Sequence, residues 1–316
     1  MDVLKVLLNL LLLAVGFFLL AKGADCFVDG SANIAKKLKI PQLVIGLTIV
    51  AMGTSAPEAA VSISAAIKGN AEITIGNVVG SNILNILIIL GISAVITSLV
   101  VSKDTIVIDI PVMIVSTILL FIMGFDGTIY WYEGLIILVI FSAYLFFLFY
   151  NAKKNKKEEV ENEEEKKEFS LPKAIIFAVL GLAMIIIGSN VSVDSATVIA
   201  KEFGVSDHFI GLTIVALGTS LPELFTSVSA AMKKNADIAI GNIVGSNIFN
   251  ILFIVGLTSV IVPVPFADIF RVDIIIALLA AVILLVCVIK TKKLQRWAGV
   301  IMLVSYAAYF IYLLNL

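Results

Sequence analysis

AMGTSAPE, residues 51–58, lies inside an apolar segment that is long enough to cross a membrane. Pro57 cannot donate a backbone hydrogen bond, and its ring crowds the carbonyl of Gly53 four residues earlier. We therefore predict that the helix breaks or kinks beside Glu58. A carboxylate is costly in hydrocarbon, so an intramembrane glutamate is by default a candidate functional residue. Freed carbonyls, hydroxyls and one carboxylate are hard oxygen ligands of the kind that Ca2+ selects.

The same stretch recurs as ALGTSLPE at residues 216–223, with Glu223 in the position of Glu58. A shift of 165 residues aligns 44–96 with 209–261 without a gap, and 35 of the 53 positions are identical. Weaker matches extend the repeat backwards through the first apolar segment. Two such stretches that face each other would form one ion site.

The composition indicates a helical membrane protein. The chain has 316 residues, is 60% hydrophobic and 14% charged, and has a mean hydropathy of +1.12. Soluble domains are typically about 45–50% apolar and about 25% charged. Apolar runs repeatedly reach the ~20 residues that span a bilayer as a helix, whereas a membrane β-barrel would show alternating strands of ~10 residues. The net charge of −1 gives no sign of nucleic-acid binding.

The fold class that we predict is an all-α polytopic membrane protein with ten transmembrane helices. The first apolar run is expected to be a retained span, because no convincing signal-peptide cleavage site follows it. The predicted spans are 3–28, 43–67, 73–98, 105–124, 131–150, 172–199, 209–232, 238–261, 272–289 and 297–314.

The spans divide into two halves, 1–152 and 170–316, joined by a charged linker at 153–169. The linker reads KKNKKEEVENEEEKKE over 153–168, and we expect a solvated connector rather than a regulatory element. Homologous halves with five spans each, an odd number, would lie inverted in the membrane. Inverted repeats are typical of secondary transporters, whose sites lie near the midplane between the repeats.

The distribution of basic residues predicts the orientation. With the linker in the cytoplasm, most lysines outside the spans lie on the inner side, as the positive-inside rule requires. Both termini then face outward across the cell membrane. The inner set is Lys36, Lys37, Lys39, Lys103, Lys173, Lys233, Lys234, Lys290, Lys292, Lys293, Arg296 and the linker lysines. The outer set is Lys5, Lys68, Lys201 and Arg271.

A second repeated motif lies in the third and eighth predicted spans. It reads GNVVGSNILN at 76–85 and GNIVGSNIFN at 241–250. Glycines four residues apart allow close helix approach. Ser81 and Asn85 share one helix face, as do Ser246 and Asn250, so each pair can point at one centre. Interhelical hydrogen bonding alone is the alternative. No Lys or Arg is predicted in the core to pair with the glutamates, which favours a mobile cation over a structural carboxylate.

The other polar residues and the cysteines are assigned no direct role. His208 lies at a predicted loop edge, where we expect no catalytic or metal function. Asp29 and Asp194 are matched across the repeats, and we expect them to act at helix ends or interfaces. Cys26 and Cys287 lie in separate apolar segments, which favours small buried residues over a disulfide or metal pair.

The two motifs together resemble the α-repeats of the cation/Ca2+ antiporter superfamily, and within it the prokaryotic Na+/Ca2+ exchanger branch. The resemblance covers nearly the whole chain. It implies a central diamond of four ion sites. The ligands it implies are Glu58, Glu223, Asn85, Asn250, Thr54, Ser55, Thr219, Ser220, Ser81 and Ser246, with the carbonyls of Ala51 and Ala216. Proton-coupled relatives carry a Gly-Asn-Ala-x-Glu pattern, which is absent here.

The resemblance also implies the transport mode. Family members often carry Asp where this chain has Asn250, and that Asp is associated with K+ use in K+-dependent relatives. We therefore expect K+-independent exchange of three Na+ for one Ca2+. Two carboxylates can neutralise one Ca2+ and cannot serve both ions fully at once, which predicts competitive occupancy. Alternating access is expected from the first and sixth spans sliding across a fixed site.

Several alternatives remain open. A Ca2+/H+ antiporter and a K+-dependent exchanger are the nearest, and a cation channel could use the same ligands. An enzyme is not expected, because the chain has one His, no His-Glu-x-x-His motif and no Ser/His pair in the core. We expect no cofactor and no obligatory protein partner. The expected substrates are Ca2+ and Na+, and the chain is expected to lie in the lipid bilayer.

Overall fold

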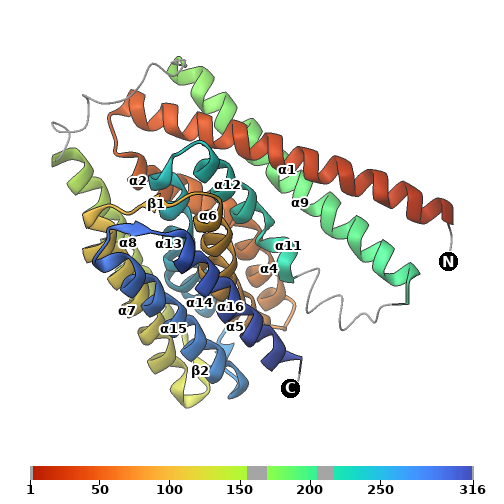
Figure 1. Cartoon of the computed structure of the whole chain (residues 1–316). Coiled ribbons are helices and arrows are strands. Elements are labelled where there is room, and N and C mark those ends of the chain that lie inside the picture. Colours follow the sequence, from red (N-terminus) through yellow and green to blue (C-terminus); the bar gives the residue numbers. More distant parts are fainter. Residues whose placement is uncertain (1–2, 155–168, 205–215, 315–316) are drawn as a thin grey trace.

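The computed structural model of the chain describes residues 3–154, 169–204 and 216–314. Helices dominate these ranges, and two short strand pairs lie between them (Figure 1). In the first half the helices are α1 (Val3–Leu38), α2 (Gln42–Ile45), α3 (Ala51–Thr54), α4 (Ala56–Ile67), α5 (Ile73–Leu84), α6 (Gly91–Ile96), α7 (Ile110–Met123) and α8 (Trp131–Lys154). In the second half they are α9 (Leu171–Glu202), α11 (Ala216–Thr219), α12 (Leu221–Met232), α13 (Ala236–Phe249), α14 (Gly256–Ile261), α15 (Ile269–Ile289) and α16 (Arg296–Leu313).

Short helical turns of other types interrupt or precede several of these helices. A 3-10 turn, η4 (Gly124–Asp126), ends α7. The π-helical segments are η1 (Gly46–Val50), η2 (Asn85–Leu90), η3 (Thr105–Asp109) and η6 (Asn250–Val255).

The structure is that of a polytopic membrane protein. Among the described residues, eight helices are long and apolar enough to cross a bilayer, and α2–α3 with α4 forms a ninth span bent by 46°. These nine coincide with nine of the predicted spans. Part of the other predicted span, 209–232, lies outside the described residues, so the count of ten stays a prediction. Large side chains on the outer faces, such as Val139 and Phe146, are exposed as lipid-facing residues would be.

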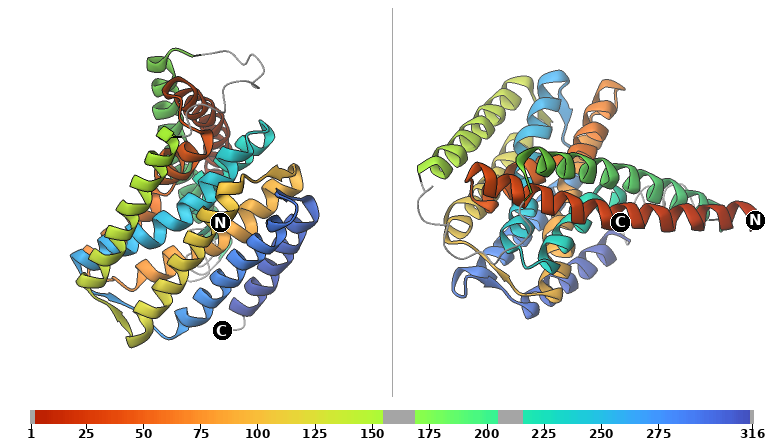
Figure 2. Two further views of the ribbon diagram at one scale, coloured as in Figure 1. Left: turned by 90° about the vertical axis from the view of Figure 1, so that its left-hand side faces the viewer. Right: turned by 90° about the horizontal axis from the view of Figure 1, so that it is seen from above.

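α1 and α9 form a unit that we call the arm. The two helices lie side by side across one face of the bundle and extend beyond it (Figures 1 and 2). They run antiparallel, because Gly16 adjoins Gly188 and Gly23 adjoins Gly181. A methyl group built on Gly23 would lie 2.8 Å from the Gly181 carbonyl oxygen, so only glycine permits this approach.

The centre of the molecule is built from the two repeated motifs. The span formed by α13, η6 and α14 is the most buried of the candidate spans. In its most apolar stretch of 18 residues, 94% of the residues are buried inside the protein. A methyl group on Gly245 of α13 would meet the Leu47 carbonyl oxygen of η1 at 2.6 Å. Gly241 and Gly245, in the second copy of this motif, therefore allow close helix packing, whereas Gly80 in the first copy has no atom within 4 Å of the position of an added methyl group.

Two strand pairs join loops of opposite halves. β1 (Leu99–Val100) pairs antiparallel with β4 (Lys293–Leu294), and β2 (Thr128–Ile129) pairs antiparallel with β3 (Val264–Pro265). The shift of 165 residues converts β1 into β3 and β2 into β4. The repeat therefore continues past the aligned motifs into the loops.

The left-handed backbone positions follow the same shift. In the described part of the chain six residues have positive φ, and they form three matched pairs with one lysine and one glycine each. The pairs are Lys39 with Gly204, Gly69 with Lys234, and Gly127 with Lys292. The turns of the two halves thus share their backbone conformation even where the residue type differs.

Candidate ion-binding site

Each half carries a helix break immediately before its glutamate. α3 ends at Thr54 and α4 begins at Ala56, with Ser55 between them at φ −82° and ψ 7°. In the second half Ser220 takes the same place at φ −89° and ψ 2°. Pro57 lies in the first turn of α4, where its missing N–H leaves no bond unmade. The predicted break is confirmed, and it places both glutamates in the first turn of a helix.

The two breaks face each other across the centre of the molecule. Ser55 Oγ donates a hydrogen bond of 2.7 Å to Glu223 Oε1. Ser220 Oγ lies 3.5 Å from Glu58 Oε1. Both carboxylates are buried, with exposed fractions of 1% for Glu58 and 0% for Glu223. Each serine thus contacts the glutamate of the other half, and one site is shared between them.

Two asparagines brace the helix breaks. Asn77 Nδ2 donates to the Glu58 carbonyl at 3.1 Å, and Asn242 Nδ2 lies 3.4 Å from the Glu223 carbonyl. Asn242 Oδ1 also accepts a bond of 3.0 Å from Thr54 Oγ1. The sequence interpretation gave Asn77 and Asn242 no role. Their identity in both repeats at the start of the second motif is the signal that could have identified them.

Four asparagines form a reciprocal cluster, which we call the amide cluster. Asn85 Nδ2 donates to Asn247 Oδ1 at 2.9 Å, and Asn250 Nδ2 donates to Asn82 Oδ1 at 3.0 Å. Asn82 and Asn247 each donate to the other's backbone carbonyl at 3.2 Å. The amide nitrogens of Asn85 and Asn250 are therefore engaged, and their oxygens are left to face the centre.

A wider helical turn begins at each of the two asparagines that are predicted as ligands. η2 starts at Asn85 and η6 starts at Asn250. Single π-helical turns of this kind are frequent at functional sites. Ser81 and Ser246, one turn earlier, are buried with them. The geometry therefore brings both serine–asparagine pairs into the centre, as predicted.

Among the residues that the structure describes, several buried side-chain atoms lack a hydrogen-bond partner, and four of them are oxygens of predicted ligands. These four are Glu58 Oε2, Glu223 Oε2, Asn85 Oδ1 and Asn250 Oδ1. Buried polar atoms are normally paired, and leaving one unpaired costs about 1–3 kcal/mol. None of the ion pairs that the structure describes involves either glutamate. Hard oxygens without donors or basic partners fit cations such as Ca2+ and Na+ as the missing partners.

The remaining predicted ligands lie on the same elements. Thr54 Oγ1 and Ser246 Oγ donate to the Ala51 carbonyl at 3.2 and 3.4 Å. Thr219 and Ala216 are the two ends of α11, immediately before the second break. The Ala51 carbonyl therefore lies at the edge of the site.

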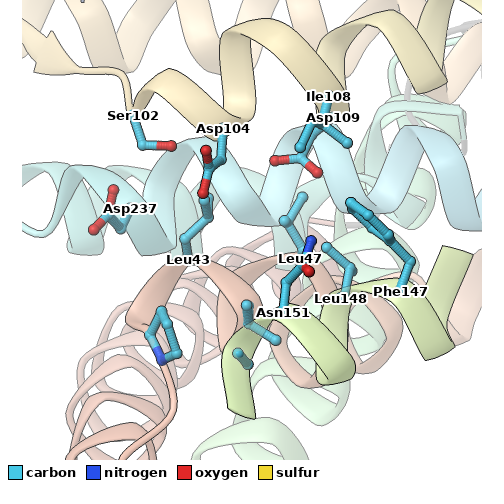
Figure 3. A pocket seen from close by; sticks show the side chains of 13 residues that line it. Leu43, Leu47, Ser102, Asp104, Ile108, Asp109, Phe147, Leu148, Asn151 and Asp237 are labelled. Atoms are coloured by element: carbon cyan, nitrogen blue, oxygen red, sulfur yellow. The ribbon is translucent and has the colours of Figure 1, made fainter. Parts of the chain in front are cut away.

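A separate cavity of about 110 Å3 lies between α2, η3 and α8 (Figure 3). Asp104, Asp109 and Asp237 line it, and Asp109 Oδ1 accepts a bond of 2.9 Å from Tyr144. Within the described residues no group of three or more His, Cys, Asp or Glu side chains is placed to hold a metal. This cavity is therefore not assigned as a second ion site.

The other residues considered in the sequence have these positions. Asp29 forms an ion pair with Lys233, the residue that directly follows α12, so its predicted interface role is confirmed. Asp194 is exposed on α9, and its role stays a prediction. His208 lies outside the described residues. Cys26 and Cys287 are both free, with Cys287 buried.

The fold and the site together define a class: a helical membrane protein whose two repeated halves enclose buried carboxylate and amide oxygens of the kind that bind cations. Comparison with known proteins identifies the family. The protein-family model described as "Sodium/calcium exchanger protein" matches residues 8–150 and again residues 173–315 of this chain. The chain belongs to this family, and the prokaryotic branch suggested by the motifs is confirmed. It is thus a transporter of the cation/Ca2+ antiport type.

Individual relatives extend over almost the whole chain. A putative antiporter CaxA from Alkalimonas amylolytica is 38% identical over 93% of this chain and 95% of its own length. The sodium/calcium exchanger MaX1 from Methanosarcina acetivorans is 35% identical over 96% and 98%. A solved structure of the sodium-calcium exchanger NCX_Mj, soaked with zero Na+ and Ca2+, matches with a TM-score of 0.85, 32% identity and coverage of 98% and 99%.

Proposed function

We propose that the chain exchanges Na+ for Ca2+ across the cell membrane at one site formed by both repeats. The observation that carries this proposal is the set of four buried, unpartnered oxygens from Glu58, Glu223, Asn85 and Asn250. Two ionised glutamates supply a charge of −2, which one Ca2+ neutralises. These oxygens are separated from water and from basic side chains. A desolvated cation is therefore the partner that would stabilise them most.

The proposed ligands are the residues that the breaks and the amide cluster bring together. Hydroxyls at each break lie beside the carboxylate of the opposite half, so a bound ion would contact both repeats. The set is Glu58, Glu223, Asn85, Asn250, Thr54, Ser55, Thr219, Ser220, Ser81 and Ser246, with the carbonyls of Ala51 and Ala216.

The coupling follows from the charge of the site. Two carboxylates cannot serve Ca2+ and Na+ fully at once, so occupancy is competitive and transport is antiport. We infer a stoichiometry of three Na+ per Ca2+, which moves one net charge per cycle. Asn250 supplies an amide oxygen and no charge. With only two carboxylates at the centre, we infer that exchange needs no K+.

We also infer that the two halves are inverted repeats of five spans each, 1–152 and 170–316, with the linker 153–169 as a cytoplasmic connector. The antiparallel packing of matched helices α1 and α9 supports this arrangement. So do the strand pairs, which exchange under the repeat shift. Both chain termini then lie outside.

The left-handed turns provide a further argument for the orientation. The lysines at these positions, Lys39, Lys234 and Lys292, all fall on the predicted inner side, and the matched glycines all fall on the outer side. A left-handed conformation costs a non-glycine residue about 1–2 kcal/mol. The positive-inside rule supplies a reason why lysine occupies these turns on one side only.

Alternating access would come from the arm moving across the bundle while the site stays in place. Ser189 Oγ of α9 donates to the Gly218 carbonyl at 2.8 Å, which brings the arm directly against the second helix break. Movement of the arm would therefore change the side of the membrane from which the site is accessible, while the ligands stay in place.

The test is Ca2+ uptake into proteoliposomes loaded with Na+ or with choline. We expect uptake only with an outward Na+ gradient, and loss of at least about 100-fold in Glu58→Gln or Glu223→Gln, since removing one partner of a buried charge set costs about 3–5 kcal/mol. Glu72→Gln is the matched control, because Glu72 is exposed. Uptake driven by a pH gradient without Na+ would instead support a Ca2+/H+ antiporter. Flux that needs no counter-ion would indicate a channel.

A further inference from the structure

Lys233 connects the helix of one site glutamate to the arm. It lies at the C-terminal end of α12, whose first turn carries Glu223. Its Nζ is 2.7 Å from Asp29 Oδ1 and 3.6 Å from Asp25 Oδ1, and it donates to the Asp25 carbonyl at 2.8 Å. Ser229 Oγ adds a bond of 2.7 Å to Asp25 Oδ1. We call these four residues the linker-side latch.

The linker-side latch lies at one end of the arm. One turn beyond Asp29, Asn33 Oδ1 accepts a bond of 3.0 Å from the backbone N–H of Phe169, where the chain leaves the linker. The far end of the arm is marked by the ion pair of Lys5 with Glu202 at 2.7 Å. An exposed ion pair is worth little alone, but here one amine meets two carboxylates and a carbonyl, which makes the contact a network.

The repeat shift identifies a matched set of residues on the other half. Lys233 corresponds to Lys68 at the end of α4, and Asp29 corresponds to Asp194 on α9. α4 carries Glu58 in its first turn, as α12 carries Glu223. In the part of the chain that the structure describes, Lys68 and Asp194 are exposed and form no ion pair with each other. The contact is thus present between α1 and the end of α12, and the matched contact between α9 and the end of α4 is not formed.

We infer that these two sets are alternating latches of the transport cycle, an inference that rests on the proposed antiport function. The linker-side latch holds the arm in the state seen here. The pair of Lys68 and Asp194, which we call the far-side latch, forms in the opposite state, while Lys233 is released. A contact made in only one of two states shifts the population toward that state.

The two latches differ in strength. The residue matched to Asp25 is Asn190, so the far-side latch has one carboxylate where the linker-side latch has two. Without bound ions, the state with the linker-side latch closed is therefore the favoured one. Ion binding has to overcome this difference in free energy between the two states in every transport cycle.

Charge removal tests the latches in proteoliposomes of known orientation. The apparent affinity at each membrane face scales with the fraction of protein that is open to that face. We expect Lys233→Met to change the ratio of half-saturating Ca2+ at the two faces several-fold, and Lys68→Met to change it in the opposite direction. Lys234→Met is the matched control, because Lys234 is the exposed neighbour of Lys233 and is also basic. A shift of the same sign in all three variants, or no shift in any, overturns the inference.

Cross-linking tests the second state directly. In a Cys26→Ser, Cys287→Ser background, the pair Asp29→Cys with Lys233→Cys and the pair Lys68→Cys with Asp194→Cys are treated with a short bifunctional thiol reagent. We expect both pairs to cross-link during exchange, the second more slowly, and each cross-link to stop exchange until it is reduced. Absence of the 68–194 cross-link under turnover, or full exchange by the cross-linked protein, contradicts the inference. Wild-type flux in the same assay tests the proposed function separately.

Discussion

Asn82 and Asn247 hold the side-chain amides of Asn250 and Asn85, the two asparagines that we propose as ligands. Each accepts the Nδ2 hydrogen bond of the ligand asparagine in the other half, so that the ligand oxygen is left for an ion. An amide turned the other way would present two N–H donors to the cation and repel it. We therefore propose that Asn82 and Asn247 are positioning residues that act through Asn250 and Asn85.

Replacement of Asn82 tests this role. Asn82→Leu keeps the volume but removes the acceptor that holds Asn250, so we expect roughly 10-fold weaker Ca2+ binding, equivalent to about 1.4 kcal/mol. Equilibrium Ca2+ binding to purified, folded protein is the measurement. In an Asn250→Leu background the same change should have little further effect, because the residue it acts through is gone. Equal losses in both backgrounds would assign Asn82 a purely structural role.

Position 250 decides the dependence on K+. The native chain should exchange Na+ for Ca2+ equally well when K+ is replaced by choline. Asn250→Asp adds a third carboxylate and removes the donor to Asn82 Oδ1. We expect tighter cation binding and stimulation by K+ that grows as the pH rises, because only the ionised side chain adds charge. Asn85→Asp is the control at the matched position. Loss of native exchange without K+ would contradict the reading of Asn250.

Much of the site could be predicted from residue types alone. The duplicated Pro-Glu and Ser-x-x-x-Asn patterns indicated the glutamates, serines and ligand asparagines that the structure brings together. Asn77 and Asn242 were missed, since a bond to a backbone carbonyl leaves no trace in hydropathy or spacing. The role of Asn82 and Asn247 was missed for a related reason: a contact between matched positions of two repeats requires knowledge of how the repeats face each other.

At the scale of helices, glycine makes the arm a single unit. A methyl group on Gly181 would lie 2.5 Å from the Phe27 backbone nitrogen and 2.7 Å from the Gly23 carbonyl oxygen. Neither atom belongs to a side chain that could move aside. These close backbone contacts hold α1 and α9 together along their length, and we expect the pair to move as one body.

Gly181→Val should separate the two helices of the arm. Overpacking of this kind costs typically 1–3 kcal/mol, so we expect a lower melting temperature in detergent and at least about 10-fold slower exchange. Gly76→Ala is the control, because its nearest neighbour is the edge of the Phe270 ring at 3.3 Å, which can rotate. If Gly181→Val exchanges at the native rate, close packing of the arm is not required for transport.

The turns with left-handed lysines give a second prediction at the scale of secondary-structure elements. Replacing Lys39, Lys234 and Lys292 together by glycine should raise the melting temperature by a few degrees. Each change removes a left-handed conformation that costs about 1–2 kcal/mol, less the roughly 0.5–1 kcal/mol of backbone freedom that glycine loses on folding. Lys103→Gly, at a helical position, should lower stability. A loss of stability in the triple variant would show that the lysine side chains outweigh the strain.

Element positions were predicted better than their ends. The predicted first span, 3–28, covers only the apolar part of α1, which continues to Leu38. The final turns carry Lys36 and Lys37, and a hydropathy pattern ends where charges begin although the helix continues beyond them. The π-helical turns and the strand pairs were not predicted; each strand pair joins loops of opposite halves, and such a contact has no signal in the sequence of either half alone.

At the scale of the whole molecule, duplication explains why one centre can hold two kinds of ion. The serine–glutamate contacts and the contacts of the amide cluster are each made twice across the centre, and each half supplies one carboxylate oxygen and one amide oxygen without a hydrogen-bond partner. Neither half can neutralise Ca2+ alone. In the proposed mechanism, occupation by Ca2+ therefore engages both halves, and occupation by Na+ has to use the same carboxylates. We propose that antiport is a consequence of this shared charge rather than of a separate coupling device.

The most direct measurement of this claim is equilibrium competition between the two ions on the purified protein. Radioactive Ca2+ bound to protein in detergent is titrated with Na+ at constant ionic strength, with choline as the replacement cation. We predict complete displacement of Ca2+ by Na+, with a Na+ dependence steeper than one ion per site, and no specific binding of Ca2+ by the Glu58→Gln, Glu223→Gln double variant. Ca2+ that stays bound at saturating Na+, or a double variant that still binds Ca2+ in a Na+-sensitive manner, would contradict a single site shared through these two glutamates.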